Sequence, residues 1–142
     1  MIEELQFRQS SHLDPALSDS AIRDLPTDKL LGHWVNTNRE TRGIASCTVE
    51  RQGDCFSVHL VGVGAEAPID WPKATAKVFA NLEEEAGQRA IALKADFEFG
   101  FMTAETYIRV NKGVLVIVLY ATFRDNSGRS NYVNREFFYR PE

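Results

Sequence analysis

The sequence has no long hydrophobic run and no export signal. Its longest uninterrupted apolar run, residues 114–121, is eight residues long, whereas a helix needs about 20 to cross a bilayer. Residues 1–5 contain neither a basic cluster nor an apolar stretch, so the N-terminus is unlike a secretory signal. We therefore expect a cytoplasmic protein without a membrane partner.

Cysteine and histidine are also scarce. Cys47 and Cys55 are the only cysteines, and in a reducing compartment we expect free thiols rather than a disulfide. Neither they nor the histidines, His12, His33 and His59, have the spacing of metal ligands. The sequence thus predicts no metal site and indicates no cofactor.

Positive charge is in deficit. The 16 Lys and Arg residues against 20 Asp and Glu residues give a net charge of −4. This balance argues against a nucleic-acid partner, which requires a basic face. The 142 residues, 44% of them hydrophobic, are enough to bury the core of one domain.

The chain divides into two regions. Residues 1–30 are predicted to be a short helical segment, with Asp14 as N-cap, Pro15 at the first helical position and Pro26 at the end. Residues 31–142 are predicted to be a β-domain, because the hydrophobic pattern from residue 33 has a period of two. The predicted strands are 33–37, 43–51, 55–63, 74–80, 89–99, 102–111, 114–124 and 130–140.

These strands are rich in β-branched and aromatic residues and are separated by turn signals. About eight short strands with short connections predict an all-β fold, an antiparallel up-and-down barrel. Segment 74–80 has a second interpretation, a helix, because Trp71-Pro72 opens it and alanines recur in it.

Two turn signals predict the strand register. Gly100-Phe101 and Lys112-Gly113 each fit a two-residue hairpin loop. Both loops independently place the same uncharged residues on one face of three strands, and we assign this face to the barrel interior. The residues are Ile91, Leu93, Ala95, Phe97, Phe99, Met102, Ala104, Thr106, Ile108, Val110, Leu115, Ile117, Leu119, Ala121 and Phe123.

The reverse assignment stays open at this point. It would line a polar cavity with Asp96, Glu105, Tyr107 and Tyr120. It is the less favourable of the two, because unpaired buried carboxylates are costly.

The start of the first strand resembles a family signature. Residues 31–34, Leu-Gly-His-Trp, resemble the Gly-x-Trp signature of the calycin superfamily, and Asn36 completes a Trp-x-Asn similar to that of its avidin branch. The resemblance implies a barrel plugged by Trp34, with an Arg of the last strand over the ring. A five-residue loop at 125–129 would put Val133, Arg135, Phe137 and Tyr139 on the apolar face, so Arg135 is the expected partner.

Other motifs carry weaker predictions. Residues 62–67 match G-x-G-x-x-A, but Pro68 and the lack of a βαβ unit favour a loop at the barrel mouth over a dinucleotide site. In the polar loop 38–43, Arg39 and Arg42 either face solvent or together bind a carboxylate or enolate. His59 is expected to face outward, and no nucleophile has a triad setting, so no catalytic residue is predicted.

The leading functional prediction is a barrel that binds one small, mostly apolar molecule in its interior. The alternative is a cofactor-free cyclase or isomerase acting on an apolar, polyketide- or terpenoid-like substrate in the same cavity. A third interpretation is a fully packed structural protein. Asn36 is expected to point inward and to bond either a ligand or the backbone. The predicted ligand-binding residues are Trp34, Asn36, Phe97, Phe99, Met102, Ala104, Thr106, Leu119, Ala121, Phe123 and Arg135.

The strand over residues 114–124 is apolar on both faces. Val114, Val116, Val118 and Tyr120 belong to its outer face, and a strand that is apolar on both faces is normally covered on both. The cover is either the N-terminal segment or a second copy of the chain. We favour a homodimer, because about fifteen residues of weak helix can cover only part of a barrel wall, and two-fold dimers are the commonest assemblies.

Overall fold

The computed structural model describes residues 29–53, 55–80 and 90–141. The helical segment predicted over residues 1–30 therefore lies outside the described residues, apart from its last two positions. In the described part of the chain, no helix is long and apolar enough to cross a membrane. The strands are β1 (Gly32–Asn36), β2 (Ile44–Gln52), β3 (Cys55–Gly62), β4 (Ile69–Asp70), β5 (Ala74–Ala80), β6 (Ala90–Glu98), β7 (Met102–Asn111), β8 (Val114–Phe123) and β9 (Tyr132–Tyr139).

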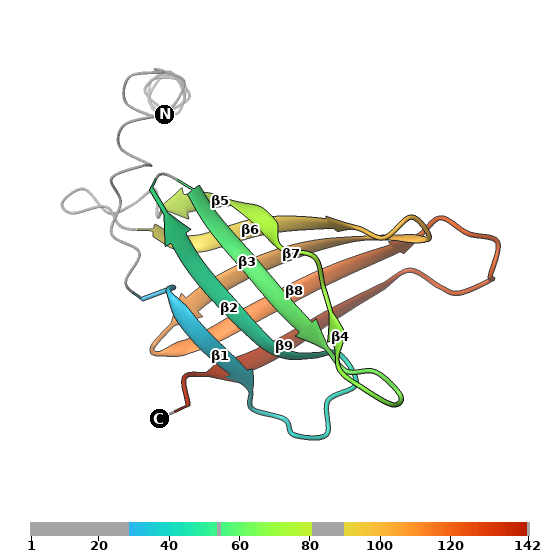
Figure 1. The fold of residues 1–142 in the computed structure, drawn as a ribbon, viewed down its shortest axis with the longest axis horizontal. Helices are drawn as coiled ribbons and strands as arrows, with labels where there is room; N and C mark the ends of the chain where they lie inside the picture. The colour runs from blue at the N-terminus through green and yellow to red at the C-terminus, as the bar shows by residue number, and fades with distance from the viewer. Residues whose placement is uncertain (1–28, 54, 81–89, 142) are drawn as a thin grey trace, which may run out of the picture.

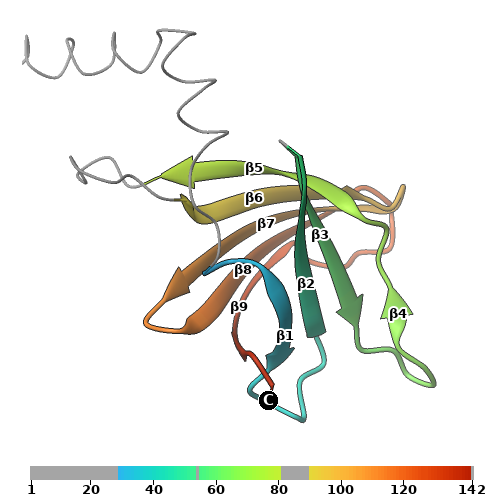
Figure 2. The same ribbon diagram turned by 60° about the vertical axis from the view of Figure 1, so that its left-hand side comes forward.

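Eight of these strands close into an antiparallel barrel (Figures 1 and 2). The order around the barrel is β2-β1-β9-β8-β7-β6-β5-β3, and the pairing of β2 with β3 closes the ring. The two-residue strand β4 adds to the edge of β3. The predicted up-and-down barrel of about eight strands is confirmed. Residues 74–80 form β5, so their interpretation as a helix is wrong.

Both predicted two-residue hairpins are present. Lys112 and Gly113 have φ angles of 53° and 81°, and a type I′ turn requires positive φ at both positions. The predicted registers follow, with Phe97 opposite Ala104 across one hairpin and Val110 opposite Leu115 across the other.

The apolar face of β6, β7 and β8 lines the interior, and the charged face is outside. Leu93 and Ile108 are at most 1% exposed, whereas Glu105 is exposed. The reverse assignment is therefore wrong. Thr106, the one polar member of the inner set, donates a hydrogen bond of 2.8 Å to the carbonyl oxygen of Ala95. Its hydroxyl is thus satisfied by the backbone.

The predicted inner face of β9 is wrong. Residues 124–131 connect β8 to β9, so the loop is longer than the five residues expected, and Ala121 lies opposite Tyr132. The longer loop shifts the inward set by one residue, which exchanges the two faces of a strand. The inner face carries Tyr132, Asn134, Glu136 and Phe138, and the outer face carries Val133, Arg135, Phe137 and Tyr139.

The two ends of the barrel differ. We call "loop end" the end at which loops 37–43, 63–68, 99–101 and 124–131 gather, and "Trp34 end" the opposite one. At the Trp34 end, the side chain of Trp34 is 1% exposed and its Nε1 donates to the carbonyl oxygen of Leu30 at 3.0 Å. The buried Trp34 ring thus fills space at this end of the barrel, and the pocket described below lies at the loop end.

Candidate functional site

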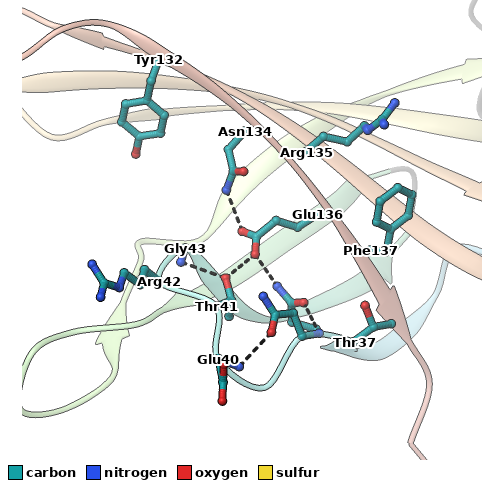
Figure 3. A pocket seen from close by; sticks show the side chains of 12 residues that line it. Thr37, Glu40, Thr41, Arg42, Gly43, Tyr132, Asn134, Arg135, Glu136 and Phe137 are labelled. Atoms are coloured by element: carbon teal, nitrogen blue, oxygen red, sulfur yellow. Dashed lines mark hydrogen bonds between the residues drawn. The ribbon is translucent and has the colours of Figure 1, made fainter.

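β1 is the shortest strand of the barrel, and it leaves part of β9 without a strand neighbour. The two strands pair only through Val35 with Tyr139 and Asn36 with Phe138, and one further bond joins the amide of Thr37 to the carbonyl oxygen of Phe137. Loop 37–43, rather than a strand, lies beside the remainder of β9 (Figure 3). Side chains have to hold the barrel closed there.

Glu136 is the centre of this contact. Its half-buried carboxylate points from the inner face of β9 toward loop 37–43 (Figure 3). Oε1 accepts from Asn134 Nδ2 at 2.9 Å and from the amide of Ile44 at 3.0 Å. Oε2 accepts from Asn36 Nδ2 at 2.6 Å and from the hydroxyl of Thr41. A carboxylate has about four lone-pair sites, so all of its acceptor capacity is used. We call Glu136 and these four donors the "Glu136 clasp".

Asn36 is the most buried member of the clasp, at 4% exposed. Besides Glu136, its Nδ2 donates to the carbonyl oxygen of Ile44 at 2.8 Å, and its Oδ1 accepts from the amide of Asn38 at 2.8 Å. The amide of Asn36 is thus bonded by two backbone groups and by the Glu136 carboxylate. Its alternative role, a hydrogen bond to a ligand, stays a prediction.

A pocket of about 640 Å³ opens over the clasp (Figure 3). Its walls come from loop 37–43 on one side and from β9 on the other. Arg42 extends away from the clasp (Figure 3), and both arginines of this loop, Arg39 and Arg42, are exposed. Their grip on a carboxylate or enolate stays a prediction. The lining residues are Asn36, Thr37, Asn38, Glu40, Thr41, Arg42, Gly43, Tyr132, Asn134, Arg135, Glu136 and Phe137.

Aromatic rings form two groups at the loop end, beside the pocket. Trp71 meets Phe97 and Phe99 edge-on, with ring centroids 5.1 and 4.9 Å apart. The first group continues to Phe101, whose ring centroid is 6.2 Å from that of Phe99. The second group is Phe123 and Tyr132, with ring centroids 6.1 Å apart. We call these six residues, Trp71, Phe97, Phe99, Phe101, Phe123 and Tyr132, the "aromatic rim". Because Tyr132 also lines the pocket, the rim and the pocket adjoin.

Arg129 joins the two halves of the rim. Its guanidinium carbon lies 4.4 Å from the ring centroid of Phe123 and 5.3 Å from that of Phe101. The same side chain donates to Asp125 at 2.8 Å. The pKa of Asp125 is lowered, chiefly by the hydrogen bond from Ser127 and further by Arg129. The 124–131 loop is thus fastened over the rim by charge and by cation–π contact.

The segment between β3 and β5 brings Trp71 over the loop end of the barrel. The backbone amide of Trp71 donates to the carbonyl oxygen of Leu60 at 3.0 Å. A Cβ at Gly62 would come within 2.9 Å of Trp71 Nε1. The first glycine of the G-x-G-x-x-A match therefore makes room for a tryptophan. Residues 63–68 form the expected loop at the barrel mouth.

At the opposite end, the partner of Trp34 is Arg140 and not Arg135. The guanidinium carbon of Arg140 lies 4.4 Å from the Trp34 ring centroid, and its Nη2 donates to the carbonyl oxygens of Lys29 and Leu31. Arg135 points outward, 5.5 Å from the ring centroid of Phe137. The predicted stacking was assigned to the wrong arginine, because the parity of β9 was inverted.

The predicted ligand-binding residues lie in three places. Those in the buried interior are Trp34, Phe97, Met102, Ala104, Thr106, Leu119 and Ala121. Phe99 and Phe123 are partly buried at the loop end, and Asn36 and Arg135 line the pocket. Their role in binding a ligand stays a prediction.

Sequence reasoning missed Glu136, Asn134, Thr41, Tyr132 and Trp71. A signal for the clasp was present in the chain, because an up-and-down barrel must pair its first strand with its last. An inward Asn36 near the end of the first strand therefore needs a polar partner from the last strand.

Two further groups lie outside this site. Cys47 is fully buried on the inner face of β2, and burial raises the pKa of its thiol to about 12. His59 faces outward on β3, as predicted, where its Nε2 lies 2.5 Å from Asp70 Oδ1. Among the described residues, no group of three His, Cys, Asp or Glu side chains gathers as a metal site would require.

Comparisons with protein-family models, with curated protein sequences and with solved structures found no match for this chain. The fold itself defines a class, the closed eight-stranded antiparallel β-barrel, and this architecture is compatible with the calycin resemblance.

Proposed function

We propose that this chain is a calycin-like cytoplasmic binding protein that holds one small, mostly apolar molecule at the loop end of its barrel. The apolar part of the molecule lies against the aromatic rim and the interior residues below it. A polar group of the molecule lies in the pocket over the Glu136 clasp.

One observation carries this proposal: the pocket adjoins the aromatic rim through a shared residue, Tyr132. The pocket volume of about 640 Å³ falls in the range of small-molecule sites, about 300–1,000 Å³. Such sites combine apolar surface with a few polar groups that orient the ligand. Here the aromatic rim supplies the apolar surface. The Tyr132 hydroxyl and the side-chain Oδ1 of Asn134 supply the polar groups.

The filled acceptor sites of Glu136 favour binding over catalysis. A general base must accept a proton from its substrate within hydrogen-bond reach, and both oxygens of Glu136 are already occupied by donors from the protein.

A cofactor-free cyclase or isomerase is the second candidate, and the same carboxylate is the observation that favours it. If a substrate displaced the Thr41 hydroxyl, Glu136 would become a base beside an apolar surface. An isomerisation, and a cyclisation without loss of a leaving group, each give an isomer of the substrate. The test is to incubate the protein with a compound that it binds and to look for an isomer of that compound. An isomer formed by wild type but not by Glu136→Gln would show an enzyme rather than a binding protein.

The binding proposal is tested with a fluorescent apolar probe, anilinonaphthalene sulfonate, titrated into the native protein. We expect one saturable site. Phe101→Ala removes a rim contact of about 1.4 kcal/mol, which weakens the probe Kd by about tenfold. Phe79→Ala is the matched control, because Phe79 is 48% exposed on β5 and Phe101 is 45% exposed at the rim.

A third variant measures how deep the probe lies. Ala104→Phe fills the interior below the rim, since Ala104 is fully buried, and it blocks a probe that enters the barrel. Saturable binding that Phe101→Ala and Ala104→Phe both leave unchanged would place the site elsewhere and refute the proposal. Absence of saturable binding would refute it as well.

A further inference from the structure

The outer face of β7, β8 and β9 is rich in exposed apolar side chains, and these strands lie side by side (Figure 1). Four aromatic side chains on this wall are 41–44% exposed: Tyr107, Tyr120, Phe137 and Tyr139. Val133 is 61% exposed. Between them, Val116 and Val118 are half-buried on β8. By contrast, the outer face of the neighbouring strand β6 carries Lys94, Asp96 and Glu98.

The composition of this wall is that of a protein interface. Interface cores are enriched in aromatic residues and arginine and depleted in lysine and acidic residues. The wall contains two arginines, Arg109 and Arg135, and its one acidic residue, Glu105, lies at the margin on β7. Among the described residues, neither arginine forms an ion pair with a carboxylate.

The register arranges these residues in rows across the three strands. One row is Arg109, Val116 and Phe137, and the next row is Tyr107, Val118 and Arg135. In both rows a valine of β8 is flanked by an arginine on one side and an aromatic ring on the other. The arginine is on β7 in the first row and on β9 in the second.

This arrangement is self-complementary about a two-fold axis along β8. A two-fold axis along β8 exchanges β7 with β9, which brings Arg109 over the partner's Phe137 and Arg135 over the partner's Tyr107. The valines of β8 then meet their own copies. An axis across the strands, midway between the two rows, would also set each arginine over an aromatic ring, but it would oppose Val118 to the partner's Val116. A cross-link through Val118 therefore distinguishes the two axes. Arginine over an aromatic ring is an attractive contact, and a two-fold interface must be self-complementary.

We infer that the chain forms a two-fold homodimer through the outer face of β7, β8 and β9, with the axis along β8. The interface reaches the pocket, because Arg135 and Phe137 also line it. The partner's Tyr107 then lies beside Arg135 at the pocket wall. The inference is independent of the proposed ligand.

The first test is sedimentation of the full chain over a range of concentrations. We expect a dimer for wild type and a monomer for Val118→Lys. Val61→Lys is the matched control and stays dimeric, since Val61 is a half-buried valine on the outer face of β3, four strands from β8 around the ring. Circular dichroism of both variants checks that they fold.

The second test does not depend on a destabilising charge. Val118 lies on the proposed axis, so Val118→Cys in a Cys55→Ser background forms a disulfide between subunits on mild oxidation. Val61→Cys in the same background does not. A wild type that is monomeric at every concentration would overturn the inference and leave residues 1–28 as the cover of this face. A dimer that survives Val118→Lys, or one without the Val118→Cys cross-link, would overturn it too.

Discussion

Replacing Glu136 with glutamine tests whether the clasp holds the barrel closed where β1 ends. Glutamine keeps the size of the side chain and one oxygen, but puts an NH₂ group where the second oxygen accepted two hydrogen bonds. If this group takes the place of Oε2, the Thr41 hydroxyl can rotate and accept from it. The Nδ2 of Asn36 cannot accept a hydrogen bond. One of its hydrogens therefore faces the new NH₂ group at a site where Asn36 is 4% exposed.

The magnitude follows from this one unsatisfied donor. Leaving a buried donor without a partner costs about 1–3 kcal/mol. We therefore expect Glu136→Gln to lower the free energy of unfolding by about 2 kcal/mol. Glu136→Ala removes all four hydrogen bonds, but water reaches the half-buried site and replaces part of them, so we expect about 2–4 kcal/mol.

Urea unfolding followed by tryptophan fluorescence measures the change. At a urea m-value of about 2 kcal/mol per molar, the midpoint of Glu136→Gln falls by about 1 M. Glu40→Gln is the control, because Glu40 is an exposed carboxylate of the same loop, and exposed substitutions stay within about 0.5 kcal/mol. If Glu136→Gln unfolds at the wild-type midpoint, the clasp contributes nothing and our account of the β1–β9 contact is wrong.

Three further results are expected. Trp34→Ala lowers the unfolding free energy by about 3–5 kcal/mol, as for other buried aromatic residues, and wild-type melting would show that the ring does not plug the barrel. Arg140→Ala destabilises the protein measurably in the same assay while Arg135→Ala does not, since only the former stacks on Trp34. Of the two thiols, only that of Cys55 reacts with a disulfide reagent in the native protein at pH 8, because burial keeps the pKa of Cys47 at about 12 and only the thiolate reacts. Reaction of both thiols without unfolding would contradict that burial.

Local turn chemistry explains why much of the barrel was predictable from the sequence. The Lys112-Gly113 turn sets the pairing of β7 with β8 residue by residue, and a one-residue slip would have mixed charged and apolar faces. Where two residues connect two strands, the chain itself thus carries the register.

The pairing of β9 was not predictable in this way. Residues 124–131 leave several loop lengths open, and the base of this loop is closed by a side chain, with the amide of Phe123 donating to Asn131 Oδ1 at 2.9 Å. The true inner face of β9 also contains Glu136, which a rule against inward charges rejects. That charge is tolerated because four donors from β1, loop 37–43, β2 and β9 reach it, and these donors are brought together only when the ring closes.

Native mass spectrometry of the full chain purified from its own host tests the central claim, that the barrel holds a small molecule at the loop end. We predict one discrete added mass per chain, lost on denaturation, diminished in Phe101→Ala and retained in Phe79→Ala. A native chain whose mass equals that of the polypeptide alone, in wild type as in both variants, would contradict the claim.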